Sequence, residues 1–262
     1  MLAMHFDRGY EPARAIRYYL QAAENANSRY AGREALSLAT RGLQLLQMVP
    51  SSPESVDSEL CLQIALGNAL MSARGLGSGD VNQAFSRARE LFQQMSNSQR
   101  SGKRTLLFSA LYGLWNYRWV RAEHAAAREL AEQLLQLAGT EQDVSLLSQA
   151  HHSLGLTMMD HGEFAGALEH LDQAGDVMSR CFAAVTKWHL GYPDQALKDV
   201  EETLARALET KNPEKCIFAY QGAAQVHMAR RENEKALDRA QSALDLALHH
   251  GLVEQWVAPM KG

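Results

Sequence analysis

The sequence predicts an all-α protein, a superhelix of about six helical hairpins that each pair two antiparallel helices. Three observations predict this fold. Ala, Leu, Gln, Glu and Arg fill long segments, and the 6 prolines and 18 glycines fall between them, which is typical of helices joined by short turns. The alternation of apolar and polar residues that marks a strand is absent over any useful length. Finally, one small residue recurs at a spacing that suits a pair of helices.

The segment LGLTMMDHGEFAGALEHLDQA, from Leu154 to Ala174, has the pattern of one hairpin. It places Gly155 in a first helix, a Gly-Glu-Phe turn at 162–164, and Ala167 in a second helix, in the order of a tetratricopeptide repeat. Antiparallel helices approach closely only where side chains are small, so we expect Gly155 to face Ala167, with Phe164 filling the cleft above them. The predicted fold is a right-handed αα superhelix of tetratricopeptide-like hairpins.

The second-helix alanine of this pattern recurs along the whole chain. Its positions are separated by 49, 43, 40, 29 and 40 residues, and they are Ala35, Ala84, Ala127, Ala167, Ala196 and Ala236. This recurrence predicts six hairpins in a single tetratricopeptide-like repeat domain over residues 1–262. The expected hairpins span roughly 12–48, 56–95, 103–138, 145–178, 181–209 and 214–249, followed by an incomplete terminal helix over 252–262.

Two irregularities interrupt the repeat. The segment from Arg74 to Ala84 lengthens the turn of the second hairpin, with Ser78 or Asp80 as the expected N-cap of the next helix. The interval of 29 residues before Ala196 is short. Either the first helix of the fifth hairpin is truncated, or a loop near residue 180 has been lost.

Charge and cysteine use restrict the partner and the compartment. The formal net charge is -4, and the basic residues are scattered singly, so we expect no nucleic-acid partner. The three cysteines, Cys61, Cys181 and Cys216, lie in apolar-patterned segments, which predicts reduced thiols and a cytoplasmic location. Charged residues interrupt the first eleven positions and no run of 18 apolar residues occurs, so we expect no signal peptide and no membrane association.

No motif for catalysis or metal binding is evident. The glycine-rich stretch from Gly75 to Gly79 follows a predicted helix and lacks the Gly-Lys-Ser/Thr of a phosphate-binding loop. Among the ten histidines, His151 and His152 diverge on a helix, and His161 and His170 are separated by a turn. We therefore expect no catalytic residue, no metal and no cofactor, and we expect that the chain is not an enzyme. A hydrolase site hidden in the groove is the weaker alternative.

The aromatic cluster YGLWNYRW, from Tyr112 to Trp119, allows two interpretations. Large residues at helical spacing are usually core packing, which is the first interpretation. In the second, Asn116 and Trp119 point toward the concave groove of the superhelix, where aromatic rings are good anchors for a partner.

The repeat register extends this second interpretation to the first helix of every hairpin. We expect charged contacts at two positions, hydrogen bonds at four, and apolar contacts at the others. The predicted groove residues are Arg17, Glu24, Asn68, Tyr112, Asn116, Trp119, His152, Met159, Trp188 and Gln225.

Several separated segments together resemble a known family. They include HFDRGYEPARAIRYYLQAAENANSRYAGREALSLATRGLQLL, LQIALGNALMSARGLGSGDVNQAFSRARELF, YGLWNYRWVRAEHAAARELAEQLLQLA and LGYPDQAL. They resemble the C-terminal helical-repeat region of bacterial STAND-type signalling ATPases, which are often fused to adenylate/guanylate cyclase-like or DNA-binding domains. The resemblance implies a tetratricopeptide-like sensor or scaffold arm. This sequence contains no ATPase or effector domain, the region around Arg180 is shortened, and the last repeat is cut off, so no family enzymatic activity is carried over.

The sequence thus predicts a non-catalytic repeat scaffold, a sensor or regulatory arm of a signalling protein. A protein or peptide partner, or a small inducer, would bind in the concave groove. The alternative is a self-associating oligomerisation module that forms a homo-oligomer through its C-terminal end, around Trp256.

Overall fold

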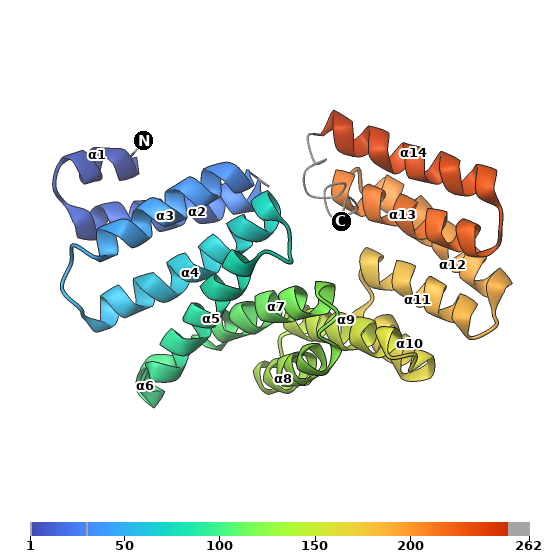
Figure 1. Cartoon of the computed structure of the whole chain (residues 1–262), viewed down its shortest axis with the longest axis horizontal. Coiled ribbons are helices and arrows are strands. Elements are labelled where there is room, and N and C mark those ends of the chain that lie inside the picture. Colours follow the sequence, from blue (N-terminus) through green and yellow to red (C-terminus); the bar gives the residue numbers. More distant parts are fainter. Residues whose placement is uncertain (1, 30, 251–262) are drawn as a thin grey trace. The chain divides into compact units, whose positions relative to one another are not determined.

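The computed structural model describes residues 2–29 and 31–250, and within them the chain is all-α (Figure 1). This confirms the predicted fold class. The helices are α1 (Leu2–Arg8), α2 (Pro12–Ser28), α3 (Gly32–Leu46), α4 (Pro53–Arg74), α5 (Gly79–Gln94), α6 (Asn97–Arg100), α7 (Arg104–Val120), α8 (His124–Glu141), α9 (Val144–Asp160), α10 (Phe164–Ala174), α11 (Val177–His189), α12 (Pro193–Glu209), α13 (Pro213–Ala229) and α14 (Asn233–His249). In this part of the chain, no helix is long and apolar enough to cross a membrane.

Each predicted hairpin range overlaps two consecutive helices, from α2 with α3 to α13 with α14, although the bounds differ by up to four residues. Neither α1 nor the one-turn helix α6 is among the helices predicted from the sequence. The single-domain organisation and the right-handed superhelix stay predictions. The expected terminal helix over 252–262, with Trp256, lies outside the described residues.

The packing contacts divide the chain into two compact units, unit 1 (residues 1–130) and unit 2 (residues 131–262), with the boundary inside α8. In unit 1, α2 packs on α3, α3 on α4, and α4 on α5 (Figure 1). The buried ring of Phe85 on α5 lies against two glycines of neighbouring helices. A Cβ atom at Gly67 of α4 would lie 2.6 Å from the Phe85 ring, and one at Gly113 of α7 would also overlap it. Only glycine lets three helices share one ring at this distance.

In unit 2, a glycine again allows close packing of two helices, at the position that the sequence predicts. A Cβ atom at Gly155 of α9 would lie 2.7 Å from Cγ of Leu171 and 3.2 Å from the backbone oxygen of Ala167 on α10. Ala167 is fully buried. The expected approach of Gly155 to Ala167 is therefore confirmed. Phe164 stacks on His189 of α11, with ring centroids 4.7 Å apart, so its ring joins α10 to the following hairpin.

One turn geometry recurs in both units. The amide of the last turn residue donates to the carbonyl five residues earlier, as from Glu163 to Met158 (2.9 Å), and the residue before it has a positive φ. The same bond links Glu11 to Phe6, Glu123 to Arg118, Tyr192 to Lys187, and Glu232 to His227. The connection from α1 to α2 therefore has the geometry of the turns inside the predicted hairpins. Its sequence, Gly9-Tyr10-Glu11-Pro12, carries the signal that would have revealed α1.

The two irregularities have distinct structural origins. Ser78 stands at the N-cap of α5, and Asp80 lies in its first turn. The short interval before Ala196 arises because α10 has 11 residues and α11 has 13, whereas α9, α12, α13 and α14 have 17 each. Asp176 caps α11 directly after the left-handed Gly175, so truncated helices and a minimal turn explain the spacing.

Candidate functional site

Three of the predicted groove residues in unit 1 are exposed polar side chains on first helices. Arg17 and Glu24 lie on α2, and Asn68 lies on α4. The two helices are neighbours, because the Asn27 side chain on α2 donates a hydrogen bond of 2.9 Å to the backbone oxygen of Ala65 on α4. We call these three residues the polar face of unit 1.

The charge of Glu24 on α2 acts on Cys61, near the middle of α4. The pKa of the Cys61 thiol on α4 is raised, mainly by burial and further by the negative charges of Glu24 and Asp57. Asp57 also forms an ion pair of 2.5 Å with Lys103, at the start of α7. Charged groups from two other first helices, Glu24 of α2 and Lys103 at the start of α7, thus lie near the side of α4 that carries Cys61.

The aromatic residues of α7 form a continuous series of ring contacts. Ring centroids lie 6.4 Å apart for Phe108 and Tyr112, 5.5 Å for Tyr112 and Trp115, and 5.6 Å for Trp115 and Trp119. Phe108 and Trp115 are buried, whereas Tyr112, Asn116 and Trp119 are half-buried. The Asn116 amide donates to the backbone oxygen of Tyr112 (3.0 Å). Core packing therefore holds for Trp115, and a binding role for the three half-buried residues stays a prediction.

His152 does not lie on an open face, and this corrects its place among the predicted groove residues. Its side chain is 4% exposed. Its Nδ1 atom lies 2.8 Å from the Ser179 hydroxyl of α11, and its ring contacts Phe182 edge-on. Burial lowers its pKa, so the imidazole is neutral near pH 7. The helical register of α9 does not show that α11 covers the side of α9 that carries His152. The adjacent His151 turns toward His170 on α10, with 2.8 Å between their Nδ1 atoms.

The other predicted residues of unit 2 differ in exposure. Met159 is half-buried near the end of α9. Trp188 is half-buried against a core cluster that includes Ala184 and Val200, so much of its ring area serves packing. Gln225 is exposed on α13. The role of these three residues in binding stays a prediction.

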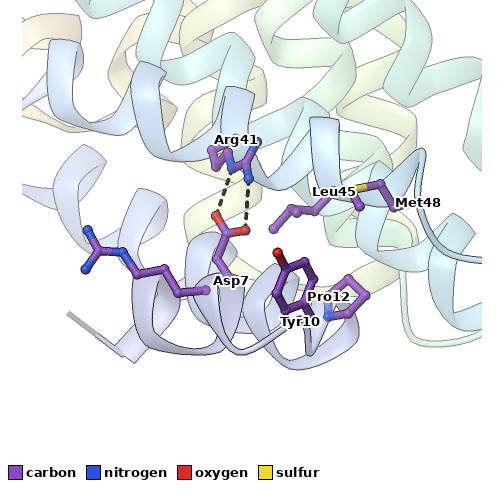
Figure 2. Close-up of a pocket in the computed structure, with 7 residues that line it drawn as sticks. Asp7, Tyr10, Pro12, Arg41, Leu45 and Met48 are labelled. Atoms are coloured by element: carbon purple, nitrogen blue, oxygen red, sulfur yellow. Dashed lines mark hydrogen bonds and ion pairs between the residues drawn. The ribbon is translucent and has the colours of Figure 1, made fainter.

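The cavity of unit 1, which the sequence analysis did not predict, lies where α1, the start of α2 and the end of α3 meet (Figure 2). Its volume is about 520 Å³, and it is lined by Asp7, Arg8, Tyr10, Pro12, Arg41, Leu45 and Met48. This volume falls within the range of about 300–1,000 Å³ that is usual for ligand pockets. Figure 2 shows Tyr10, Pro12, Leu45 and Met48 together on one side of the Asp7–Arg41 pair.

The Asp7–Arg41 pair fixes α1 to α3 at this cavity. The Arg41 guanidinium donates two hydrogen bonds to Asp7, from Nε (2.8 Å) and Nη2 (2.9 Å), and the Tyr19 hydroxyl donates a third (3.0 Å). The hydrogen bonds from Arg41 hold the pKa of Asp7 below its usual value, and burial raises the pKa of Tyr19. Asp7 and Arg41 are 34 positions apart in the sequence, so no local sequence pattern predicts that they pair.

The three cysteine thiols are poorly suited to act as nucleophiles. Burial raises the pKa of all three thiols, that of Cys181 to about 12, so they are protonated near pH 7. In the described ranges, no group of three His, Cys, Asp or Glu side chains has the arrangement of a metal site.

The fold is similar to known helical-repeat structures. The structure of BtubC (BKLC) from P. vanneervenii matches with a TM-score of 0.56 at 13% identity, over 90% of this chain and 92% of that one. Other matches have TM-scores below 0.5. A Rap protein complexed with competence and sporulation factor gives 0.48 at 12% identity, over 92% of this chain and 78% of that one. A Podosopora anserina kinesin light chain with TPR-like repeats gives 0.35 at 14% identity, over 90% and 95%.

No family model matches the sequence, and the comparison with curated proteins finds no match. At this level of identity, the similarity defines the fold alone.

Proposed function

We propose that this chain is a non-catalytic repeat scaffold that binds a protein or peptide partner through the first helices of its hairpins. The observation that carries the proposal is the polar face of unit 1. Arg17 and Glu24 of α2 and Asn68 of α4 are all exposed, on helices that the Asn27–Ala65 hydrogen bond holds side by side. Repeat proteins bind partners with such faces, where each repeat contributes a few side chains to an extended surface.

Peptide selection tests this function although the partner is unidentified. A random dodecapeptide phage library is panned on the full chain, and the affinity of the selected peptides is measured by fluorescence anisotropy. We expect the triple variant Arg17→Ala, Glu24→Ala, Asn68→Ala to bind them at least tenfold more weakly, because a few central residues usually supply most of the binding energy.

The matched control moves the substitutions to second helices of the same unit. The variant Thr40→Ala, Gln83→Ala, Gln94→Ala changes three polar residues on α3 and α5 that lie outside the polar face. We expect it to bind like the wild type. Equal affinities for the two triple variants would contradict a binding role for the polar face. If the double variant Asn116→Ala, Trp119→Ala binds the peptides like the wild type, α7 is not part of the binding surface.

A second candidate function is self-association through the last described helix. Leu237 (70% exposed) and Leu248 (59% exposed) lie eleven residues apart on α14, with the half-buried Leu244 between them on the same stripe. Exposed apolar stripes of this kind are typical of association surfaces. Light scattering over a concentration series tests this candidate. A mass that stays monomeric throughout, or that is unchanged by Leu237→Glu with Leu248→Glu, would eliminate it.

We further propose, from the sequence resemblance, that the scaffold is the cytoplasmic sensor arm of a STAND-type signalling protein. The resemblance spans nearly the whole chain, and its segments are separated from one another. The neighbouring coding sequence tests this context. An ATPase domain in the same reading frame ahead of Met1 would support it, and an unrelated upstream gene would contradict it.

A further inference from the structure

We propose that the cavity of unit 1 binds a peptide segment in which an apolar side chain lies next to a carboxylate. The apolar side chain would pack on Tyr10, Pro12, Leu45 and Met48, and the carboxylate would pair with Arg8. This inference rests on the proposed function, because it names the class of peptide that one part of the scaffold recognises.

The apolar part of the cavity has unused contact area. Leu45 is buried and forms part of the wall, whereas Met48 is 68% exposed and Tyr10 is 90% exposed. Figure 2 shows these side chains and Pro12 on the same side of the Asp7–Arg41 pair. An apolar side chain placed among them would remove area from water on both partners, at about 25 cal/mol per Å². A methionine and a tyrosine suit this task, because the first adapts its shape and the second is rigid.

The charged part of the cavity favours an acidic group. Asp7 accepts two hydrogen bonds from Arg41 and one from Tyr19, and the third nitrogen of Arg41, Nη1, donates to Gln44 (3.2 Å). The pair is therefore neutral and its polar atoms are engaged. Arg8 is exposed, and in the described part of the chain it forms no ion pair. The Arg8 charge also acts on Asp7 and helps to lower its pKa. Asp7, Arg8 and Arg41 together give the lining a net charge of +1, which a carboxylate complements by a charge-assisted hydrogen bond.

The size of the cavity favours a short segment. A volume of about 520 Å³ accommodates one or two side chains of a bound peptide. The ligand is therefore a peptide feature, either a C-terminal apolar residue with its free carboxylate or an apolar residue beside an acidic one.

Tyr10 allows a test that preserves the fold. Its φ is 57°, in the left-handed region that glycine adopts without strain. The substitution Tyr10→Gly removes the ring and relieves the backbone at the same time, so loss of binding by this variant does not reflect unfolding. Tyr192 is also exposed and lies in the equivalent turn of α11 and α12, one position after the residue with positive φ. Tyr192→Gly therefore controls for the loss of an exposed tyrosine ring outside the cavity.

The experiment uses the full chain with methyl-labelled methionine and follows the Met48 methyl resonance by NMR. The probes are N-acetyl-leucine and N-acetyl-phenylalanine, their carboxamides, and octanoate. We expect the two acids to shift the Met48 resonance and to bind about three- to fivefold more tightly than the amides, the size expected for one exposed ion pair. We expect Arg8→Gln to abolish this difference and Tyr10→Gly to weaken all the amino-acid probes. Tyr192→Gly should change neither the difference between acids and amides nor the affinity of the amino-acid probes.

Each contrary result overturns a defined part of the proposal. Equal affinity of the acids and their amides would show that the cavity does not recognise a carboxylate. If octanoate binds more tightly than the N-acetyl amino acids, the ligand of the cavity is a fatty acid and not a peptide. If no probe shifts Met48, the cavity is not a ligand site, and the polar face of unit 1 then stands or falls by its own peptide-affinity experiment.

Discussion

At the residue scale, glycines set the distance between helices. Gly155 of α9 lies where any side chain would overlap Leu171 of α10, whereas a Cβ atom added at Gly139 of α8 would meet nothing within 4 Å. Both are helical glycines, yet only the first is required by packing. Substitutions at these two glycines therefore measure two effects separately, overpacking at Gly155 and the low helix propensity of glycine at Gly139.

We expect Gly155→Val to lower the free energy of unfolding by about 1–3 kcal/mol, because the new methyl groups force Leu171 out of its place. Gly139→Ala should raise it by up to about 1 kcal/mol, because alanine is the better helix former and has room. Urea denaturation of both variants gives the two values. A stable Gly155→Val variant would show that α9 and α10 can separate at little cost.

The buried His152 makes stability depend on pH. Its folded pKa is lowered by burial, so the unfolded chain binds a proton more readily as pH falls below about 6.5, the ordinary histidine value. We expect the free energy of unfolding to fall between about pH 6.5 and 5 for this reason. His152→Gln should have a flatter profile over the same range. Parallel profiles would show that His152 is not responsible.

At the element scale, a charged cluster joins three helices of unit 2. The buried His227 of α13 has Nε2 3.0 Å from Glu201 of α12 and Nδ1 2.6 Å from Glu232 before α14. Arg230 lies 3.1 Å from Glu232 and 3.0 Å from Asp194, and Arg239 lies 3.3 Å from Glu201. The cluster links α12, α13 and α14 by directional contacts, where apolar packing alone would allow the helices to slide.

We expect this cluster to lose its contribution in acid. Hydrogen bonds from His227 and Arg230 lower the pKa of Glu232 to about 2, from 4.5. A carboxylate with a depressed pKa stabilises the fold above its unfolded value and loses that contribution as pH falls from about 4.5 toward 2. Glu232→Gln should be less stable than the wild type at pH 7, and the two should converge below pH 3 by thermal denaturation. A constant difference across this range would contradict the assignment.

At the scale of the whole molecule, each unit is built of helices that contact mainly their neighbours. In a repeat array, stability is a sum of terms from each repeat and its neighbours. Overpacking in one hairpin should therefore loosen that hairpin and those beside it. Gly222 of α13 provides the site, since a Cβ atom there would lie 2.6 Å from Cβ and Sγ of Cys181 on α11.

We expect Gly222→Val to speed amide hydrogen exchange in α11–α14 while exchange in α2–α4 stays unchanged. Hydrogen exchange with mass spectrometry measures both regions in one sample. The matched control is Gly139→Ala, which should slow exchange in α8 and leave α11–α14 as they are. Equal acceleration in α2–α4 would show that the chain unfolds as one cooperative body.

The sequence by itself determined the helical hairpins and their close contacts. Helix composition, short turns and small residues act between neighbours in the chain, so the approach of Gly155 to Ala167 could be read from spacing. The α1–α2 turn carried the same local signal and could have been found. Arg17 and Gln225, which the helical register places on an open face, are exposed, and their role in binding stays a prediction.

Only the tertiary structure decided which side of each helix stays open and which distant residues meet. His152 is covered by α11, Trp188 packs on a core cluster, and Asp7 meets Arg41 across 34 positions. These outcomes depend on how whole helices pack, because a register gives the direction of a side chain on its own helix but does not say which neighbouring helix lies there. The cavity of unit 1 arises in the same way, from three segments that become adjacent only when α1, α2 and α3 pack together.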